Sequence, residues 1–203
     1  MNSKRQKILD EAVKVFAENN YYEAKTDEIA RNAGVSKGIV FHYFETKENL
    51  YLQTLYHALE VIEEFMTEVP WPEGELTEVI AWSNSRKWLA AEKYPEITRL
   101  IFSAMGGVPE NIQNLFLKKV TEYEEIGFNI LDESVKKIPL KEGVERSDVV
   151  YLINQLMRVV YNDTLLYLRM HPNAKIDELS FLRDRSIKML ELIQSGFRKE
   201  NAD

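Results

Sequence analysis

Residues 26–47 read TDEIARNAGVSKGIVFHYFETK, and this stretch decides the expected fold. It predicts a short helix that begins at Thr26, whose hydroxyl can cap the first free N–H groups. Gly34 ends that helix, because glycine tolerates the left-handed backbone needed just past a helix end. Ser36 can cap a second short helix that carries the aromatic cluster HYF. Two short helices joined by a glycine turn form a helix-turn-helix, so the stretch predicts binding to DNA.

The residues before this stretch have the pattern of a further helix. Ser3 and Gln6 fit a capping box, in which side chains satisfy free N–H groups at a helix start. Residues 3–19 place apolar side chains on one face at helical spacing, namely Ile8, Leu9, Ala12, Val13, Phe16 and Ala17. Residues 1–46 are therefore predicted to form a three-helix DNA-binding domain.

Residues 4–51 read KRQKILDEAVKVFAENNYYEAKTDEIARNAGVSKGIVFHYFETKENLY and resemble the N-terminal domain of the TetR family of bacterial transcriptional regulators. The most specific elements are the leading IL-x-x-A-x-x-x-F pattern, TDEIA, AGVSKG, and HYF followed by KE. The resemblance implies a ligand-responsive repressor that binds a pseudo-palindromic operator as a dimer and is released by a small apolar or aromatic effector. The alternative is a helical module that binds a small molecule or a protein and has no DNA activity of its own.

The start of the second short helix carries the residues expected to read DNA. Lys37 can reach a guanine edge or a phosphate, whereas the alternative is a solvated lysine. Gly38 lets the backbone approach DNA closely, or it is simply a tolerated helix glycine. The family pattern places Ile39 and Phe41 on the groove side, where thymine methyls are their partners, although apolar residues of this kind also suit a core.

Tyr43 and Lys47 flank this helix, and a phenol and an ammonium can together hold one phosphate strand. The resemblance assigns the matching positions to phosphate. Thr26 is expected to add a backbone contact through the N-terminus of its helix, and His42 either touches DNA or packs at the domain edge. The candidate DNA-contacting residues are thus Thr26, Ser36, Lys37, Gly38, Ile39, Phe41, His42, Tyr43 and Lys47.

Other residues of the same domain have different expected roles. Val40 and Phe44 are expected in its core. Lys4 and Arg5 either reach a minor groove as a flexible arm or belong to a solvated terminus.

Composition and charge fit a DNA-binding domain at residues 1–46, called the head below, followed by an acidic remainder of the chain. The chain has 203 residues, no cysteine and a formal net charge of −7. Residues 1–50 carry eight basic and eight acidic side chains, so the whole net negative charge falls on the rest of the chain. The charged N-terminus is not a signal peptide, and no stretch approaches the roughly 18 apolar residues of a membrane span. We expect a cytoplasmic protein without disulfides and without a membrane partner.

The remainder reads as helices throughout, which predicts an all-α chain of about nine helices. Thr46 caps a long connector helix that ends before VPWPEGE, residues 69–75, where prolines and a glycine break the pattern. Further helices are expected at about 76–92, 95–105, 109–137, 147–170 and 177–197, the last one capped by Asp177. Residues 47–203 are predicted to form a ligand-binding and dimerisation domain.

The helix at 147–170 is informative because its apolar residues, Leu165 and Leu168 included, go nearly all round it. Such a helix is buried on two faces. Either it lies in a large monomer core, or it packs with the last helix against their symmetry mates in a four-helix homodimer interface, which the resemblance also implies. The candidate interface residues are Leu152, Leu156, Val160, Leu182, Met189 and Ile193.

Large apolar side chains in the second domain are the candidates for an effector site. Core packing explains any one of them, whereas the resemblance implies a cavity that suits an apolar or planar cationic compound. The candidates are Phe65, Trp82, Trp88, Phe102, Met105, Phe116, Tyr123, Phe128, Met157 and Tyr161. Asn162 and Asp163 either orient a ligand or lie at the dimer interface.

No pattern predicts an enzyme, a cofactor or a metal site. His42, His57 and His171 lie far apart in sequence, and none has the Glu-x-x-His spacing of helical di-iron proteins. The sequence also lacks a P-loop and a dinucleotide-binding glycine fingerprint.

Overall fold

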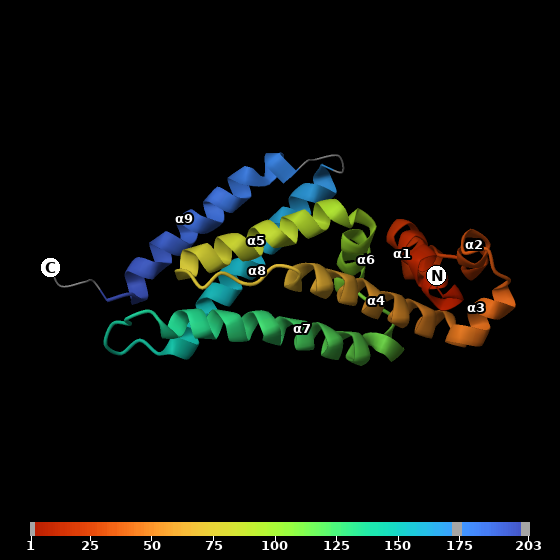
Figure 1. Cartoon of the computed structure of the whole chain (residues 1–203), viewed down its shortest axis with the longest axis horizontal. Coiled ribbons are helices and arrows are strands. Elements are labelled where there is room, and N and C mark those ends of the chain that lie inside the picture. The colour runs from red at the N-terminus through yellow and green to blue at the C-terminus, as the bar shows by residue number, and fades with distance from the viewer. Residues whose placement is uncertain (1–2, 172–175, 200–203) are drawn as a thin grey trace. The chain divides into compact units, whose positions relative to one another are not determined.

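The structure is a computed structural model that describes residues 3–171 and 176–199. Within these ranges, the side chains of Leu165, Leu168 and Asp177 lie outside what it describes, and so does the predicted cap by Asp177. The described residues form nine α-helices and one short 3-10 helix, which confirms the predicted all-α class (Figure 1). The elements are α1 Lys4–Glu23, α2 Thr26–Asn32, α3 Lys37–Phe44, α4 Lys47–Thr67, α5 Leu76–Lys93, α6 Pro95–Met105, α7 Glu110–Lys136, α8 Arg146–Met170, η1 Ile176–Leu179 and α9 Ser180–Phe197.

Most predicted helix ends agree with the structure because local signals set them. Pro95 occupies the first turn of α6, where its missing N–H costs nothing. The Thr46 side chain accepts a hydrogen bond from the Asn49 N–H at 3.1 Å and caps α4 as predicted. The last helix differs from its prediction, since residues 176–179 form the 3-10 turn η1 and α9 begins at Ser180.

Two predicted caps in the helix-turn-helix are wrong in detail. Thr26 is the first residue of α2 rather than its cap, because Lys25 occupies the cap position, and no side chain caps this helix. Thr26 is instead buried, with 9% of its surface exposed. Ser36 does stand at the cap position of α3, but its hydroxyl accepts no capping hydrogen bond. Its backbone carbonyl accepts from the Ile39 N–H at 3.0 Å and so begins the helix.

The chain divides into two compact units that are not contiguous in sequence. Unit 1 comprises Met1–Glu68 and Lys93–Glu122, and unit 2 comprises Val69–Glu92 and Tyr123–Asp203. The helices that follow the head, α4, α6 and the first part of α7, therefore fall in the same unit as α1, α2 and α3. The expected domain boundary between residues 46 and 47 lies inside unit 1, and it stays a prediction.

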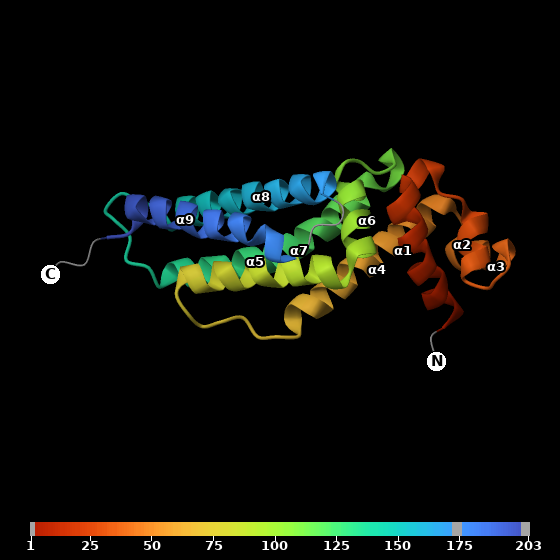
Figure 2. The same cartoon turned by 90° about the horizontal axis from the view of Figure 1, so that it is seen from above.

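Unit 1 is built on α1, which packs against both α4 and α6 (Figure 2). The face predicted from helical spacing is the one that is buried, with Ile8 and Phe16 fully enclosed. The ring of Phe16 meets that of the buried Tyr51 from α4 edge-on, with centroids 4.7 Å apart. Leu100 of α6 is fully buried as well. Each such side chain contributes about 1.5 to 3 kcal/mol by leaving water.

Unit 2 has a core formed by α5, the end of α7, α8 and α9. Val150, Ile153 and Leu190 are fully enclosed there. Figure 2 shows α8 and α9 side by side, and the two helices pack against each other. A buried hydrogen bond of 3.1 Å from the Asn84 side chain to the Ser186 hydroxyl joins α5 to α9.

Candidate nucleic-acid interface

The helix-turn-helix has the backbone geometry that its sequence predicts. Gly34 adopts a φ of 68°, the left-handed conformation that ends α2. The Val35 N–H then donates to the Ala30 carbonyl at 3.0 Å and turns the chain toward α3. Val40 and Phe44, each 1% exposed, pack into the core as predicted. These anchors fix which side of α3 remains outside.

The outer side of α3 presents a mixed polar and apolar surface. Lys37, Gly38 and His42 are exposed, while Ile39 and Phe41 are half-buried. A Cβ added at Gly38 would meet only the Ser36 hydroxyl, at 3.8 Å, which is an ordinary contact. Nothing inside the head therefore requires glycine at this position. The missing side chain leaves the backbone of α3 accessible at this exposed position.

Lys37 has a partner within the head that sequence reasoning missed. Its ammonium lies 2.9 Å from a carboxylate oxygen of Asp27 on α2, and both side chains are largely exposed. The same ammonium lies 6.0 Å from the centre of the Phe41 ring. Binding of the Lys37 ammonium to a base or a phosphate would compete with its contact to Asp27. The pair spans ten residues and two helices, so no local spacing pattern signals it.

Lys47 opens α4 and contacts the end of α1. Its ammonium lies 4.8 Å from the centre of the Tyr21 ring and donates to the Tyr22 carbonyl at 3.4 Å. Burial lowers the pKa of Lys47, and the charge of Glu48 opposes that shift. The Tyr21 hydroxyl donates to Glu48 at 2.8 Å, and burial together with this bond raises the pKa of Tyr21 to about 12. The carboxylate and the lysine are thus both held by α1.

Tyr43 is the other predicted phosphate ligand, and 41% of its surface is exposed on α3. Its ring packs edge-on against His42, with centroids 5.5 Å apart. Both rings therefore stand on the accessible side of the head, while the neighbouring Phe44 fills its core. The phenolic hydroxyl is available to donate to an external oxygen.

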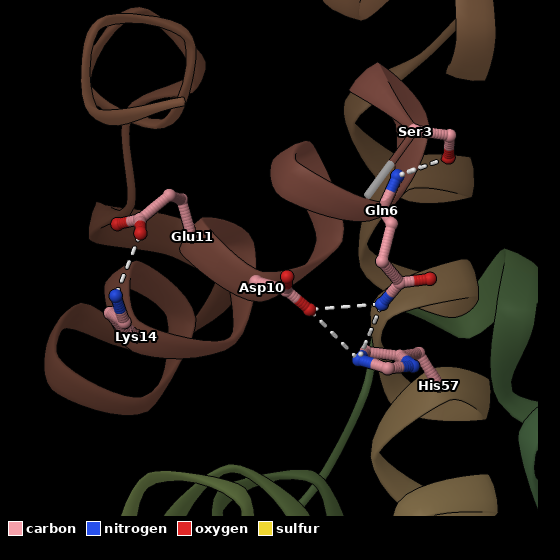
Figure 3. A network of polar contacts seen from close by, with 6 residues as sticks. All are labelled: Ser3, Gln6, Asp10, Glu11, Lys14 and His57. Carbon is pink, nitrogen blue, oxygen red and sulfur yellow. Dashed lines mark hydrogen bonds and ion pairs between the residues drawn. The ribbon is translucent and has the colours of Figure 1, made fainter. Parts of the chain in front are cut away.

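A polar network ties α1 to α4 (Figure 3). The Gln6 amide donates to Asp10 at 2.9 Å and lies 3.1 Å from His57 Nε2, which is itself 3.3 Å from the Asp10 carboxylate. Gln6 also donates its backbone N–H to the Ser3 hydroxyl at 3.2 Å, which forms the serine half of the predicted capping box. The network shows His57 as a link between helices. Among the described residues, no cluster of His, Cys, Asp and Glu could hold a metal ion.

Arg5 is part of the same contact between α1 and α4 and is not a free arm. Its guanidinium donates to the Gln53 side chain at 2.9 Å and lies 5.4 Å from the centre of the Phe44 ring. The predicted reach of Arg5 into a minor groove would require both contacts to break.

The residues expected at the dimer interface lie at different depths in the structure, and their role stays a prediction. Leu156 and Val160 belong to the core cluster of unit 2, and Leu182 is buried with Trp88, so these side chains are not at the surface. Met189 and Ile193 are half-buried against the same core. Only Leu152 among the predicted residues is exposed, at 46%. Among the described side chains, the large apolar ones that α8 and α9 expose are Tyr151, Leu152, Val159, Tyr161, Leu166, Met170, Phe181 and Leu192.

The predicted effector residues divide between the two units. Phe65, Phe102, Met105 and Phe116 lie in unit 1, and the other six lie in unit 2. Phe65, Trp88 and Phe116 are buried, whereas Met105, Phe128 and Tyr161 are exposed. No described helix is long and apolar enough to cross a membrane.

Comparison with known proteins agrees with the geometry of the head. Residues 8–54 match the model of the family described as bacterial regulatory proteins, tetR family. The chain is 29% identical over 218 aligned positions to the fatty acid metabolism regulator protein of Bacillus subtilis, an alignment that covers 98% of this chain and 100% of that protein. It is 30% identical to the HTH-type transcriptional regulator QacR of Staphylococcus aureus, over 68% of this chain and 63% of QacR.

A solved structure supports the same fold along the chain. The transcriptional regulator FadR of Bacillus subtilis, crystallised with stearoyl-CoA, superposes with a TM-score of 0.68. The superposition covers 91% of this chain and 96% of FadR at 22% identity. By the match of residues 8–54 and by these relatives, the chain belongs to the tetR family of bacterial regulatory proteins and is a DNA-binding transcriptional regulator.

Proposed function

We propose that the chain is a repressor that binds a pseudo-palindromic operator as a homodimer and leaves it when an apolar effector binds. The observation that carries this proposal is the outer side of α3, where Lys37, Gly38 and Tyr43 are exposed on a helix anchored by the buried Val40 and Phe44. A short helix held in this way can enter a major groove. Because such a regulator acts on bacterial DNA, we place it in the cytoplasm.

The proposed contacts divide into positioning and reading. Tyr43 and Lys47 bind phosphate and set the register, as accessible hydroxyl and ammonium groups at either side of α3 can do. Lys37 reaches a base edge or a phosphate once it leaves Asp27. Ile39 and Phe41, half-buried but accessible, meet thymine methyls.

The remaining candidates make weaker contacts in this proposal. Gly38 lets the backbone come close to DNA. Ser36 and His42 are exposed at the two ends of the same surface. Thr26 is buried, so it contributes through the free N–H groups at the start of α2 rather than through its hydroxyl.

The proposed dimer interface is the exposed apolar side of α8 and α9. Tyr151, Leu152 and Val159 recur along α8 with 46 to 65% of their surfaces exposed, and Phe181 and Leu192 are exposed on α9. Water-exposed apolar rows of this kind are stabilised when a second copy covers them. A two-fold axis through this surface would pair two heads for one palindromic site.

The proposed effector is a long-chain acyl compound such as a fatty acyl-CoA. The relative that aligns along the full length is a fatty acid metabolism regulator, and the structurally similar FadR was crystallised with stearoyl-CoA. In unit 1 the buried Phe65 and Phe116 and the half-buried Phe102 offer the apolar surface that an acyl chain needs. In unit 2 the corresponding candidates are the buried Trp88 and the half-buried Trp82, Tyr123 and Met157. Met105, Phe128 and Tyr161 are at the surface and are the least suited of the predicted residues.

One experiment tests operator binding and release together. The wild-type protein selects a duplex from a random-sequence DNA pool, and fluorescence anisotropy then measures its affinity with and without stearoyl-CoA. We expect a palindromic duplex, a dimer by light scattering, and weaker DNA binding when stearoyl-CoA is present. Linkage then requires the duplex to weaken stearoyl-CoA binding by the same factor. Equal ligand affinities with and without the duplex would reject stearoyl-CoA as the effector, and failure to enrich any duplex would favour a binding module without DNA activity.

A further inference from the structure

The Lys47 ammonium is held in place by the last turn of α1. It lies 4.8 Å from the centre of the Tyr21 ring, a distance at which the ring face attracts a cation. It also donates to the Tyr22 carbonyl at 3.4 Å. A lysine side chain in water samples many rotamers, and binding to a phosphate normally removes that freedom. These two contacts restrict it before any DNA is present.

The shape of that last turn is unusual and is what places the ring. Asn20 adopts a φ of 52°, in the left-handed region that residues other than glycine rarely enter. Its side-chain oxygen accepts hydrogen bonds from the N–H groups of Tyr22 at 2.9 Å and Glu23 at 3.3 Å. Residues 21–23 follow this break, and Tyr21 and Tyr22 contact the start of α4 through Glu48 and Lys47.

Tyr21 itself is fixed at both ends. Its ring lies 5.1 Å, between centroids, from the ring of Tyr51, which is 1% exposed in the core of unit 1. Its hydroxyl donates to the Glu48 carboxylate at 2.8 Å. This bond keeps the carboxylate of Glu48, the residue after Lys47 in sequence, at the Tyr21 hydroxyl. The Tyr21 ring is therefore a rigid surface for the Lys47 ammonium. The nearby Glu48 carboxylate already accepts a hydrogen bond from the Tyr21 hydroxyl.

We propose that Tyr21 is a positioning residue for DNA binding, whose ring holds the Lys47 ammonium in place for the phosphate backbone. This inference rests on the assignment of Lys47 to phosphate in the proposed function. Burial lowers the pKa of Lys47, so the ammonium has already lost part of its water shell at this position. Freezing a long side chain on binding weakens affinity by about two- to tenfold, and Tyr21 removes much of that loss.

The test compares Tyr21→Leu and Tyr21→Phe in the wild-type chain and in a Lys47→Ala chain. The probe is the duplex that the wild-type protein selects from random-sequence DNA, and the measurement is its dissociation constant at several salt concentrations. In the wild-type chain, Tyr21→Leu should weaken binding by about three- to tenfold, while Tyr21→Phe keeps the ring and recovers most of the affinity. In the Lys47→Ala chain, Tyr21→Leu should have no further effect.

A matched control separates this role from aromatic packing in general. Tyr94→Leu removes a contact of the same type, since the Lys93 ammonium lies 5.1 Å from the Tyr94 ring before α6. This control should leave DNA binding unchanged. If Tyr21→Leu unfolds the head, a fluorinated phenylalanine in place of Tyr21 keeps the shape while weakening the attraction of the ring for a cation. That replacement should reproduce the loss of affinity.

Different failures have different meanings in this design. An equal loss from Tyr21→Leu with and without Lys47 would overturn the positioning role and leave Lys47 as a phosphate ligand. Equal losses from Tyr21→Leu and Tyr21→Phe, or full affinity with the fluorinated ring, would also overturn it. Unchanged binding by Lys47→Ala alone would instead remove Lys47 from the DNA contacts of the proposed function, and the inference about Tyr21 would be rejected with it.

Discussion

Replacing Asp27 by asparagine should tighten DNA binding even though it weakens a helix. In the free protein the Asp27 carboxylate holds the Lys37 ammonium at 2.9 Å. Lys37 has to give up this ion pair when it binds DNA. An asparagine in place of the aspartate would keep the size of the side chain and remove its charge, so Asp27→Asn releases Lys37 without changing the packing.

The magnitude follows from the exposure of the pair. The two side chains are 51% and 67% exposed, and ion pairs with such exposure contribute about 0.2 to 1 kcal/mol. Removing that competing contact should raise affinity by about 1.4- to fivefold. Asp27 also lies in the first turn of α2, where the helix dipole favours a negative charge by about 0.3 to 1 kcal/mol. The variant should therefore unfold slightly more easily while it binds DNA more tightly.

The assay is an anisotropy titration of the selected duplex at several salt concentrations, together with urea unfolding. A freed Lys37 neutralises a phosphate without first losing an internal partner. The plot of the logarithm of the DNA association constant against the logarithm of the salt concentration should therefore become steeper by up to about 0.9. Glu28→Gln is the matched control, because it removes one negative charge from the same helical turn and does not touch the Lys37 pair.

Three results would refute the reasoning. A gain of the same size from Glu28→Gln would mean that only the overall charge of the head matters. A gain that persists when Asp27→Asn is combined with Lys37→Ala would mean that Lys37 takes no part in DNA binding. Loss of affinity in Asp27→Asn would show that the ion pair holds Lys37 in its binding position.

Three further outcomes are expected. Thr46→Ala removes the α4 cap and should lower the free energy of unfolding by about 1 kcal/mol in urea titrations, with no change expected if the cap is dispensable. Leu152→Glu should give folded monomers in light scattering, whereas Leu156→Glu should unfold unit 2, and a dimeric Leu152→Glu would exclude this face. A hydrogen bond from its own backbone N–H, then that from Tyr21, lowers the pKa of Glu48. The stability that ionised Glu48 gives the fold is therefore fully present above its ordinary pKa of 4.5 and is lost as the pH falls through its lowered pKa in the folded protein. The free energy of unfolding of Glu48→Gln should therefore depend less on pH in the acid range.

The sequence by itself determined the elements of this protein. Gly34 marks the end of α2 and Pro95 the start of α6, and both act through the backbone of their immediate neighbours. Helical spacing likewise identified the buried face of α1, because one row of apolar residues leaves a single choice. The order and spacing of these local signals were also enough to indicate the DNA-binding head.

Only the tertiary structure decided which of two apolar faces is inside. On α8, Leu156 and Val160 are buried while Leu152 and Val159 are exposed, and the apolar pattern of the helix contains both rows. The neighbours of the helix choose between them, and those neighbours are distant in sequence. Helix periodicity alone could therefore not tell which of the predicted dimer residues are buried within the chain, and the interface itself stays a prediction.

The partners of the candidate DNA-binding lysines also came only from the tertiary structure. Lys37 meets Asp27 across the turn between α2 and α3, and Lys47 meets Tyr21 where α1 ends beside α4. Each contact depends on the angle at which two helices cross and on where one of them stops. Helix periodicity places a residue on its own helix, but it carries no information about which side chain of another helix lies a few ångströms away.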